Sequence, residues 1–582
     1  MFKSQLPQKV KIFGSIMIVL NIIMPLATLI QRLQPIVKLP TTTNIIGIIS
    51  LILLIVDQGT VYFLFRQYQY KRGMKISMKS FFIVSCLVLT IQFLINFQGY
   101  SEIPIRTDMV LIFLGFLNFI PFIYAACLIY AHFYWFIPQI QQARGIKIER
   151  RMTSKLSKTN RYWLIVSISL NIILLGFGAL IDYTLFFARS QGLFMLGVFA
   201  AMLSLFFGLI FLIKTFQIMS SFQQLLEASK IKTSALLITA MIGFSISSIS
   251  FIPVLGTPIY IRDAERVFDT AFNPEFGGNW ETQISDAAQN YFKKNHFQLV
   301  DYFIGPNNPP CVEIKDILYF NGSESNFTVD QSIMLYFDAY LPPLNYVGLP
   351  GENSTLIRIH GGGWVIGDKG SGNIGMMNRY FASQGYCVFD IQYGLNNESD
   401  LFGNIPFKPT NVMGNFTIDD MLRHIGNFTY FLEAHATEFG VNLDSVFVSG
   451  GSAGGQLTCA TALSLASKNY TEFSDAYTIK GMVPFYPANN VTFDFAASSK
   501  PEWVDPVMLI NMTSPPCLIF QGNQDPLIIQ SKILRQKYQS FGRTDCALIT
   551  FPFAGHGNDV YFPGFYNQIF LYYMERFLYL YH

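Results

Sequence analysis

Charged residues are scarce in this chain: they make up 13% of its 582 residues, whereas hydrophobic residues make up 51%. A soluble globular protein usually carries about 25% charged residues, so we infer that part of the chain lies in a membrane. Neither sign of charge dominates, since the formal net charge is only +3. Because no concentrated basic face is evident, the sequence argues against a nucleic-acid partner.

Cysteine is also scarce, and its count is odd, with seven residues. An odd count leaves at least one thiol unpaired. Cys86 and Cys127 lie within long apolar runs, and Cys387, Cys517 and Cys546 lie in or beside predicted strands. We therefore predict mostly buried free thiols and no disulfide framework. No pattern of residues implies a metal or an organic cofactor.

Apolar residues are concentrated before residue 256, in runs separated by short basic loops. A helix that crosses a bilayer needs roughly 20 such residues. A single run could be a buried core helix, and the first run could be a cleaved signal peptide, but seven in succession favour a multi-pass membrane domain. The predicted spans are 12–30, 44–65, 81–97, 109–137, 162–181, 191–213 and 235–255.

The loops between these runs differ in charge. The N-terminal segment and the second, fourth and sixth loops hold 18 Lys and Arg residues, against four in the loops between them. Cytoplasmic loops carry the excess of Lys and Arg. The pattern predicts a cytoplasmic N-terminus and, after seven crossings, a C-terminal half that is lumenal or extracellular.

Glycosylation signals agree with this orientation, because all nine N-x-[ST] sequons follow residue 256. Such sequons also arise by chance in polar sequence, so each is only a candidate site. The candidate acceptors are Asn321, Asn326, Asn353, Asn397, Asn415, Asn427, Asn469, Asn490 and Asn511.

The second half of the chain alternates strand-like and helix-like segments, which predicts a mainly parallel sheet with helices on both faces. We divide the chain into a membrane domain (1–256), a connector (257–300) with helices near 263–272 and 281–294, and a globular α/β domain (301–582). The predicted strands are 333–340, 356–360, 386–392, 445–449, 481–485, 517–521 and 548–551. The predicted helices are 418–439, 453–466, 529–540 and 567–580.

The motif G-x-S-x-G occurs between a predicted strand and a predicted helix, in the sequence VSGGSAGGQ around Ser452. At such a sharp turn the serine is exposed for nucleophilic attack, and the flanking Gly450 and Gly454 let strand and helix approach closely. A flexible glycine-rich linker is the alternative interpretation. It does not account for a second motif upstream, IHGGGW, at the end of another predicted strand. Backbone N–H groups of Gly361 and Gly362, with that of Ala453, would form an oxyanion hole.

An acid and a base follow in the expected order. Asp525 comes after the predicted strand at 517–521, and His556 comes after the last strand, in the loop AGHG. The chain order serine, aspartate, histidine is that of α/β-hydrolases. Asp505 is a weaker alternative acid. His360 precedes the serine, where this fold does not place its base, and is interpreted as a structural residue.

Residues 333–580 resemble the α/β-hydrolase superfamily, and most closely the hormone-sensitive-lipase-like carboxylesterases. The resemblance lies in MLYFDAYLP, IHGGGWVIGDK, FLEAHATEFGVNLDSVFVSGGSAGG, SPPCLIFQGNQDPLI and AGHG. Kynurenine-formamidase-like and prenylcysteine-methylesterase-like enzymes are nearby members. Many relatives carry an acidic residue before the nucleophile, where this chain has Gly451. The membrane half resembles no family that we identify.

We therefore expect a membrane-bound serine esterase that acts on small-molecule or lipid-like esters, with Phe493, Phe495 and Trp503 as candidate pocket residues. The same catalytic residues cleave amides, so the sequence does not distinguish an ester from an amide substrate. A catalytically idle hydrolase fold that serves as a receptor or adhesion module is the alternative. Asp57 lies inside the second predicted span, where a carboxylate is often functional, so transport is a further hypothesis. A hydrogen bond between helices explains this residue more simply. No feature of the sequence indicates an oligomeric state.

Overall fold

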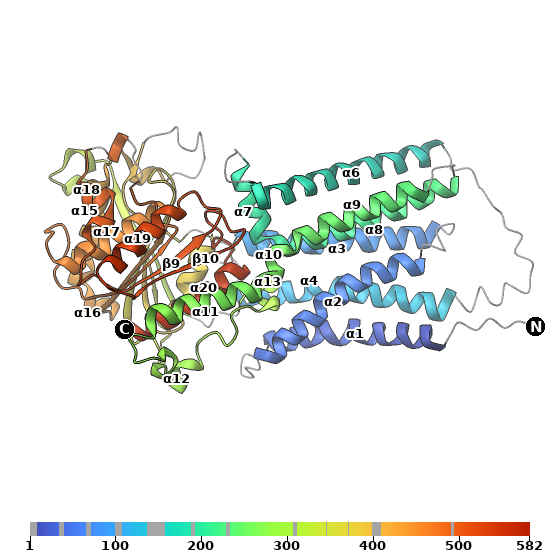
Figure 1. Ribbon diagram of the computed structural model, residues 1–582, viewed down its shortest axis with the longest axis horizontal. Coiled ribbons are helices and arrows are strands. Elements are labelled where there is room, and N and C mark those ends of the chain that lie inside the picture. Colours follow the sequence, from blue (N-terminus) through green and yellow to red (C-terminus); the bar gives the residue numbers. More distant parts are fainter. Residues whose placement is uncertain are drawn as a thin grey trace, which may run out of the picture.

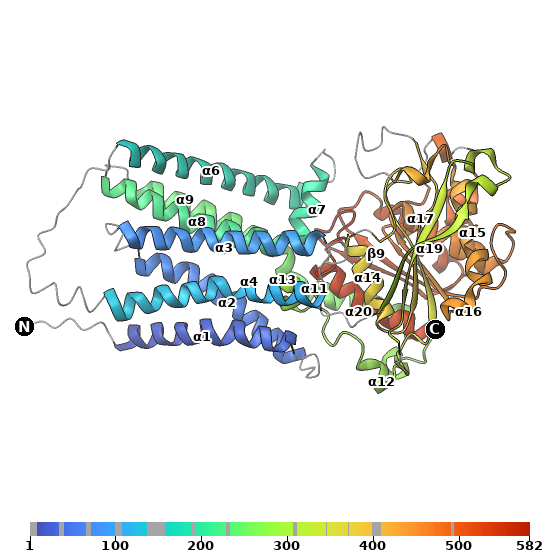
Figure 2. The same cartoon turned by 180° about the vertical axis from the view of Figure 1, so that it is seen from behind.

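The computed structural model describes residues 8–33, 40–65, 72–98, 107–136, 158–187, 193–228, 233–306, 311–344, 346–370, 372–397, 409–490, 494–496 and 498–582. The chain forms two parts, a bundle of long helices and a globular domain built on one sheet, which meet end to end (Figure 1). Helix α1 begins at the end of the bundle that is far from the sheet domain, as both views show (Figure 2).

The bundle contains long helices that are apolar on most of their surface. A helix satisfies all its backbone hydrogen bonds internally, which a bilayer requires. Six described helices are long and apolar enough to cross a membrane, over Lys11–Ile30, Asn44–Leu64, Ile76–Asn96, Phe113–Phe133, Arg161–Phe187 and Ser204–Phe222. They belong to α1 (Gln8–Leu33), α2 (Pro40–Phe65), α3 (Arg72–Gln98), α4 (Thr107–Tyr130, continued by η3, Ala131–Phe136), α6 (Lys158–Phe187) and α8 (Ser204–Ala228).

Two predicted spans are placed differently. The predicted sixth span, 191–213, is broken at Leu203, which leaves helical geometry (ψ 17°), so that α7 (Phe194–Met202) is a separate short helix before α8. Hydropathy cannot detect this break because both sides of it are apolar. The predicted seventh span, 235–255, divides into α9 (Thr233–Ser250) and α10 (Ile252–Leu255), and its apolar part is shorter, Leu237–Ser250. Helix α9 nevertheless runs beside α8 in the same bundle (Figure 1).

Asp57 lies inside the bundle with a partner on the neighbouring helix. Its side chain is 1% exposed, and its Oδ1 accepts a hydrogen bond from Asn21 Nδ2 at 2.9 Å. The pair links α2 to α1. It is the hydrogen bond between helices that the sequence offered as the simpler alternative to a transport function.

The residues predicted as a connector pack against the sheet domain. Helix α11 (Thr257–Phe272) lies against β10 and α20. The single helix predicted near 281–294 is instead two short turns, η5 (Trp280–Gln283) and α12 (Asp286–Gln289), followed later by α13 (Leu299–Ile304).

The sheet has eight strands in the order β1-β2-β4-β3-β7-β8-β9-β10. Strands β3 to β10 of this sheet pair in parallel, while β1 and β2 form an antiparallel edge. The bounds are β1 (Val312–Asn321), β2 (Met334–Leu341), β3 (Ser354–Ile359), β4 (Cys387–Ile391), β7 (Asn442–Gly451), β8 (Ile479–Phe485), β9 (Cys517–Gly522) and β10 (Cys546–Phe551). The two-residue strands β5 (Leu395–Asn396) and β6 (Met413–Gly414) form a separate pair.

Helices cover both faces of the sheet, as predicted. Successive side chains of a strand point to opposite faces, so Phe447 packs in one hydrophobic cluster and Val446 and Val448 in the other. The first face carries α11, α14 (Gly372–Ala382) and α20 (Phe565–Tyr581), and the second carries α15 (Ile418–Ala434), α17 (Ala453–Ser467) and α19 (Ile528–Ser540). The short helix α16 (Ala436–Phe439) follows α15.

The cluster under α11 and α20 continues into the bundle, so the two parts share one hydrophobic core. Polar contacts cross the same junction. The Tyr302 hydroxyl donates to the Met202 carbonyl at 2.9 Å, and Asn96 Nδ2 donates to the Phe303 carbonyl at 2.8 Å. The sheet domain is therefore docked on the bundle rather than tethered to it by a loose linker.

The nine sequon asparagines all lie in the sheet domain, and seven are exposed. Asn321 and Asn427 are half-buried. Among the described residues all seven cysteines are free, and four of them are buried.

Candidate active site

Ser452 lies at the turn between β7 and α17, with φ 59° and ψ −120°. This is strained backbone for a residue with a side chain, and such strain concentrates at functional sites. The turn is tight because its glycines touch the neighbouring strand. A Cβ atom on Gly450 would lie 2.3 Å from the Ile359 carbonyl oxygen, and one on Gly454 would lie 2.2 Å from it. Both positions of the motif therefore require glycine.

Gly451, where many relatives carry an acidic residue, faces a tyrosine. A Cβ atom at this position would lie 2.9 Å from the Tyr486 hydroxyl oxygen. That hydroxyl donates to Asp559 Oδ1 at 2.6 Å, and the Tyr486 ring lies against the ring of His556, with centroids 4.5 Å apart. Tyr486 occupies the space that a larger residue before Ser452 would need.

The structure brings Ser452, His556 and Asp525 together, although they are far apart in the sequence. Ser452 Oγ lies 2.7 Å from His556 Nε2, and His556 Nδ1 lies 2.9 Å from Asp525 Oδ2. The Asp525 side chain is fully buried, and its other oxygen accepts the Leu527 amide at 2.8 Å. The His556 side chain is 26% exposed and Ser452 is half-buried, so both can be reached from the surface.

The glycine motif after β3 lies beside the nucleophile. A Cβ atom on Gly361 would lie 3.4 Å from Ser452 Cβ and 2.5 Å from the Gly451 carbonyl oxygen. Gly362 has φ 124°, which only glycine adopts readily. Ala453 is the first residue of α17, where a helix leaves backbone N–H groups without an intrahelical partner. Gly361 and Ala453 thus adjoin Ser452, and Gly362 follows Gly361 in the same loop.

The other residues weighed from the sequence lie elsewhere. Asp505 accepts the Val507 amide at the start of η10 (Pro506–Leu509). The His360 ring stacks on Tyr393 and bonds the Gly361 carbonyl, and burial lowers its pKa, so it supports the glycine loop as a neutral ring. His424 is buried against Asp330.

The candidate pocket residues differ in their surroundings. Trp503 is 1% exposed and donates to Ser464 Oγ, which makes it a core residue. Phe495 contacts Trp364 of the glycine motif, with ring centroids 6.0 Å apart. Phe493 lies outside the described residues.

A buried polar cluster beneath the site has no sequence motif. Arg358 donates from Nη1 to Ser449 Oγ at 2.6 Å, and it lies close enough to Asp559 and Asp390 for their charges to act on it. Burial raises the pKa of Asp559 above its usual value, and its bond to Tyr486 acts in the opposite direction. The only sequence signal is the position of Asp559, three residues after His556.

The loops that carry Asp525 and His556 rest directly on the helical bundle. Asn558 Nδ2 donates to the Val198 carbonyl of α7 at 3.0 Å, while its Oδ1 accepts the Gly555 amide. Gln524, next to Asp525, donates to the carbonyl of Leu185 in α6. The aspartate and histidine are therefore held in place partly by the bundle, which sequence analysis missed.

The sequence matches one family model and one curated protein. The BD-FAE family model matches residues 337–503. The probable carboxylic ester hydrolase LipM of Mycobacterium tuberculosis is 23% identical over 237 residues, which cover 36% of this chain and 51% of LipM. The chain thus aligns with about half the length of this curated relative.

Solved structures of an esterase also align. Thermogutta terrifontis esterase 2 phosphorylated by paraoxon is 21% identical, with a TM-score of 0.33 over 43% of this chain and 86% of that chain. The apo form of the same esterase is 21% identical, with a TM-score of 0.34 over 47% and 92%. The strand order and the serine turn after β7, together with the family match, identify the sheet domain as an α/β-hydrolase fold.

Proposed function

We propose that this chain is a membrane-bound serine hydrolase that cleaves carboxylic esters through an acyl-enzyme on Ser452. The observation that carries the proposal is a chain of two hydrogen bonds, from Ser452 Oγ to His556 and from His556 to Asp525, with Ser452 at a strained turn. The relative LipM is named a probable carboxylic ester hydrolase, and the aligned solved structures are of an esterase, which supports an ester as the substrate.

The chemistry follows from the geometry. His556 Nε2 takes the Ser452 proton as Oγ bonds to the ester carbonyl carbon, and Asp525 stabilises the resulting imidazolium. Backbone N–H groups of Ala453, Gly361 and Gly362 stabilise the negative carbonyl oxygen. The carbon–oxygen bond to the alcohol then breaks, and His556 returns its proton to the leaving alcohol. A water molecule, activated by the same histidine, releases the acid and restores the serine.

The proposed placement puts the sheet domain on the lumenal or extracellular side. Arg72 and Lys158, at the starts of α3 and α6, belong to the basic loops, and these helix ends lie far from the sheet domain (Figure 1). Since basic loops remain in the cytoplasm, the opposite end of the bundle would face the lumen or the exterior. The exposed sequon asparagines on the sheet domain support the same side.

The test uses the full chain in lipid nanodiscs with a panel of p-nitrophenyl and lipid esters and matched amides. We expect the wild type to hydrolyse at least one ester, and Ser452→Ala to reduce that rate to the uncatalysed level. A rate that persists in Ser452→Ala, or hydrolysis of amides alone, would contradict the proposal. Orientation is tested separately by glycosidase treatment of sealed microsomes, where a protected, glycosylated sheet domain is expected.

A further inference from the structure

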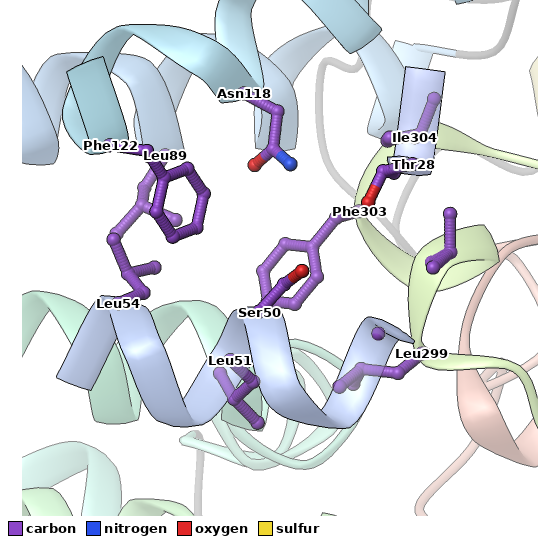
Figure 3. A pocket seen from close by; sticks show the side chains of 12 residues that line it. Thr28, Ser50, Leu51, Leu54, Leu89, Asn118, Phe122, Leu299, Phe303 and Ile304 are labelled. Carbon is purple, nitrogen blue, oxygen red and sulfur yellow. The ribbon is translucent and has the colours of Figure 1, made fainter. Parts of the chain in front are cut away.

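The bundle contains a hollow on its outer surface, between α6 and α9, of about 480 Å³. Ligand sites usually enclose about 300–1,000 Å³, so this space is large enough for a small lipid. A second cavity lies inside the bundle, where Asn118 and Ser50 face the same space (Figure 3), but its volume of about 30 Å³ suits only a water molecule or two.

The hollow lies in the half of the bundle nearest the sheet domain. Tyr183 and Phe186, near the end of α6, line the side closer to the sheet domain. Met241 and Ile242, in the middle of α9, line the side farther from it. These four side chains are 44–62% exposed, and α6 belongs to a candidate span. The walls would therefore contact acyl chains, which identifies the apolar part of an occupant as a hydrocarbon chain.

One buried carboxylate breaks this apolar lining. Asp182 lines the hollow and is only 5% exposed. Its Oδ1 accepts from Ser250 Oγ at 2.7 Å, whereas its Oδ2 has no hydrogen-bond partner among the described residues. A carboxylate within a membrane segment is costly and commonly functional. Oδ2 is itself shielded from solvent, and a buried acceptor without a partner is costly, so a ligand hydroxyl that reaches it from the hollow would gain a hydrogen bond.

The depth of Asp182 matches the polar end of a lipid. Asp182 lies five residues before the end of α6, which is about 8 Å along the helix axis. The apolar walls at Ile242 and Met241 lie further from the sheet domain. A lipid in the hollow would thus place its polar end toward the sheet domain and its chain toward the bilayer centre.

The upper end of the hollow adjoins the loops of the proposed active site. The ring of Phe186 packs edge to face on Phe553, with centroids 5.5 Å apart, and Phe553 is three residues before His556. The neighbouring Leu185 carbonyl accepts from Gln524, next to Asp525. A lipid leaving the bilayer along this hollow would reach the histidine loop first.

We propose that the hollow binds the acyl chain of a single-chain lipid ester that carries a free hydroxyl, and that Asp182 accepts a hydrogen bond from that hydroxyl. This inference rests on the proposed ester hydrolysis and names its substrate class. It also gives the multi-pass bundle a function beyond anchoring.

The first experiment measures binding without hydrolysis. The probe is a 1-O-alkylglycerol ether that carries a diazirine and an alkyne on its chain, added to the full chain in nanodiscs and crosslinked by light. We expect labelled peptides from α6 and α9 near the hollow, and about 10-fold less labelling in Ala179→Trp, which places a bulky ring in it. Ile173→Trp, a 68% exposed position of α6 outside the hollow, is the matched control and should label like the wild type.

The second experiment measures specificity with 1-monooleoylglycerol, methyl oleate and p-nitrophenyl acetate. Ala179→Trp should lower kcat/KM for both oleoyl esters about 10-fold and leave acetate hydrolysis unchanged. Asp182→Asn keeps an acceptor for Ser250 but offers an N–H where the free oxygen was, so it should lower kcat/KM about 10-fold for monooleoylglycerol only, as expected for a lost bond to a charged group.

The outcomes separate the two proposals. Acetate hydrolysis with equal oleoyl turnover in Ala179→Trp and Ile173→Trp, or with no crosslinks in the hollow, would overturn the lipid site and leave the esterase intact. Crosslinking in the hollow without hydrolysis of any ester would overturn the esterase instead. Acetate hydrolysis also reports whether each variant is folded.

Discussion

At the residue scale the account depends on Ser452 and its unusual backbone. A φ of 59° costs about 1–3 kcal/mol for a residue that is not glycine. The G-x-S-x-G pattern predicted this turn, because only a few backbone arrangements allow a strand and a helix to meet so closely. The order of serine, acid and base was expected from the α/β-hydrolase pattern, and each of the three follows a strand: β7, β9 and β10.

Ser452→Gly should abolish ester hydrolysis and yet stabilise the protein. Glycine adopts positive φ without a steric penalty, so we expect thermal unfolding about 2–4 °C higher than for Ser452→Ala, measured by tryptophan fluorescence in nanodiscs. Equal unfolding temperatures would show that the turn is not strained.

Gly451→Ala tests the contact with Tyr486. The added methyl group would lie 2.9 Å from the Tyr486 hydroxyl and push the tyrosine toward His556, so we expect kcat to fall about 10-fold through overpacking. Gly451→Ala combined with Tyr486→Phe should recover part of that loss, since the hydroxyl is gone. An unchanged kcat in the single variant would mean that the tyrosine moves freely.

Asp390 on β4 predicts a pH dependence of stability. Burial raises the pKa of its carboxyl to about 6, and only its Oδ2 has hydrogen-bond donors, from Gly370 and Asn378. Because the folded-state pKa is raised, this group stabilises the fold at low pH, and that contribution is lost as the pH rises from about 4 to 6, by roughly 3 kcal/mol.

Asp390→Asn removes this titration while it keeps one acceptor oxygen. The unfolding temperature of the variant relative to the wild type should therefore be higher at pH 7.5 than at pH 4.5, and the difference should not grow further above pH 7. A constant difference across this range would contradict a buried carboxyl with a raised pKa.

No sequence pattern could reveal Asp390, Tyr486 or Arg358 as a cluster, because their contacts depend on the strand register.

At the scale of elements, the central strands and their helices follow from alternating hydrophobicity and turn residues. Strand β1 escaped prediction because it is an exposed antiparallel edge: four of its ten residues, Glu313 to Asp316, are exposed in succession. The break between α7 and α8 escaped because hydropathy does not change across it. That break matters, since α7 is the helix on which the His556 loop rests.

Asn558 connects the loop of the base to α7, so it should act as a positioning residue. Asn558→Asp keeps the acceptor for the Gly555 amide but directs a carboxylate oxygen at the Val198 carbonyl. We expect kcat to fall about 10-fold or more with little change in KM for p-nitrophenyl acetate, because a buried polar group loses its partner. Asn558→Gln, which can still donate, serves as comparison. A change confined to KM would indicate a role in binding instead.

At the scale of the whole molecule, the bundle and the sheet domain form a single structural unit. The sequence suggested two domains joined by a polar connector, whereas the hydrophobic core runs through α11 and α13 into the bundle. Composition cannot show this, because the junction is built from residues such as Phe206 and Tyr302, whose rings lie 5.4 Å apart although they are distant in the sequence.

Residues 257–582 expressed alone should therefore be impaired. Removal of the bundle exposes the apolar surface around Tyr302 and deletes the partners of Asn558 and Gln524. We expect aggregation or an unfolding temperature at least about 5 °C below that of the full chain, together with slower ester hydrolysis. A truncated domain as stable and active as the full chain would show that the bundle is only an anchor.

The most direct test of the central claim is mass spectrometry of the folded full chain after reaction with a fluorophosphonate probe. We predict a single adduct on Ser452, no adduct after heat denaturation, and labelling slowed at least about 10³-fold in His556→Ala. Absence of an adduct on Ser452, while a known esterase in the same tube is labelled, would contradict the account.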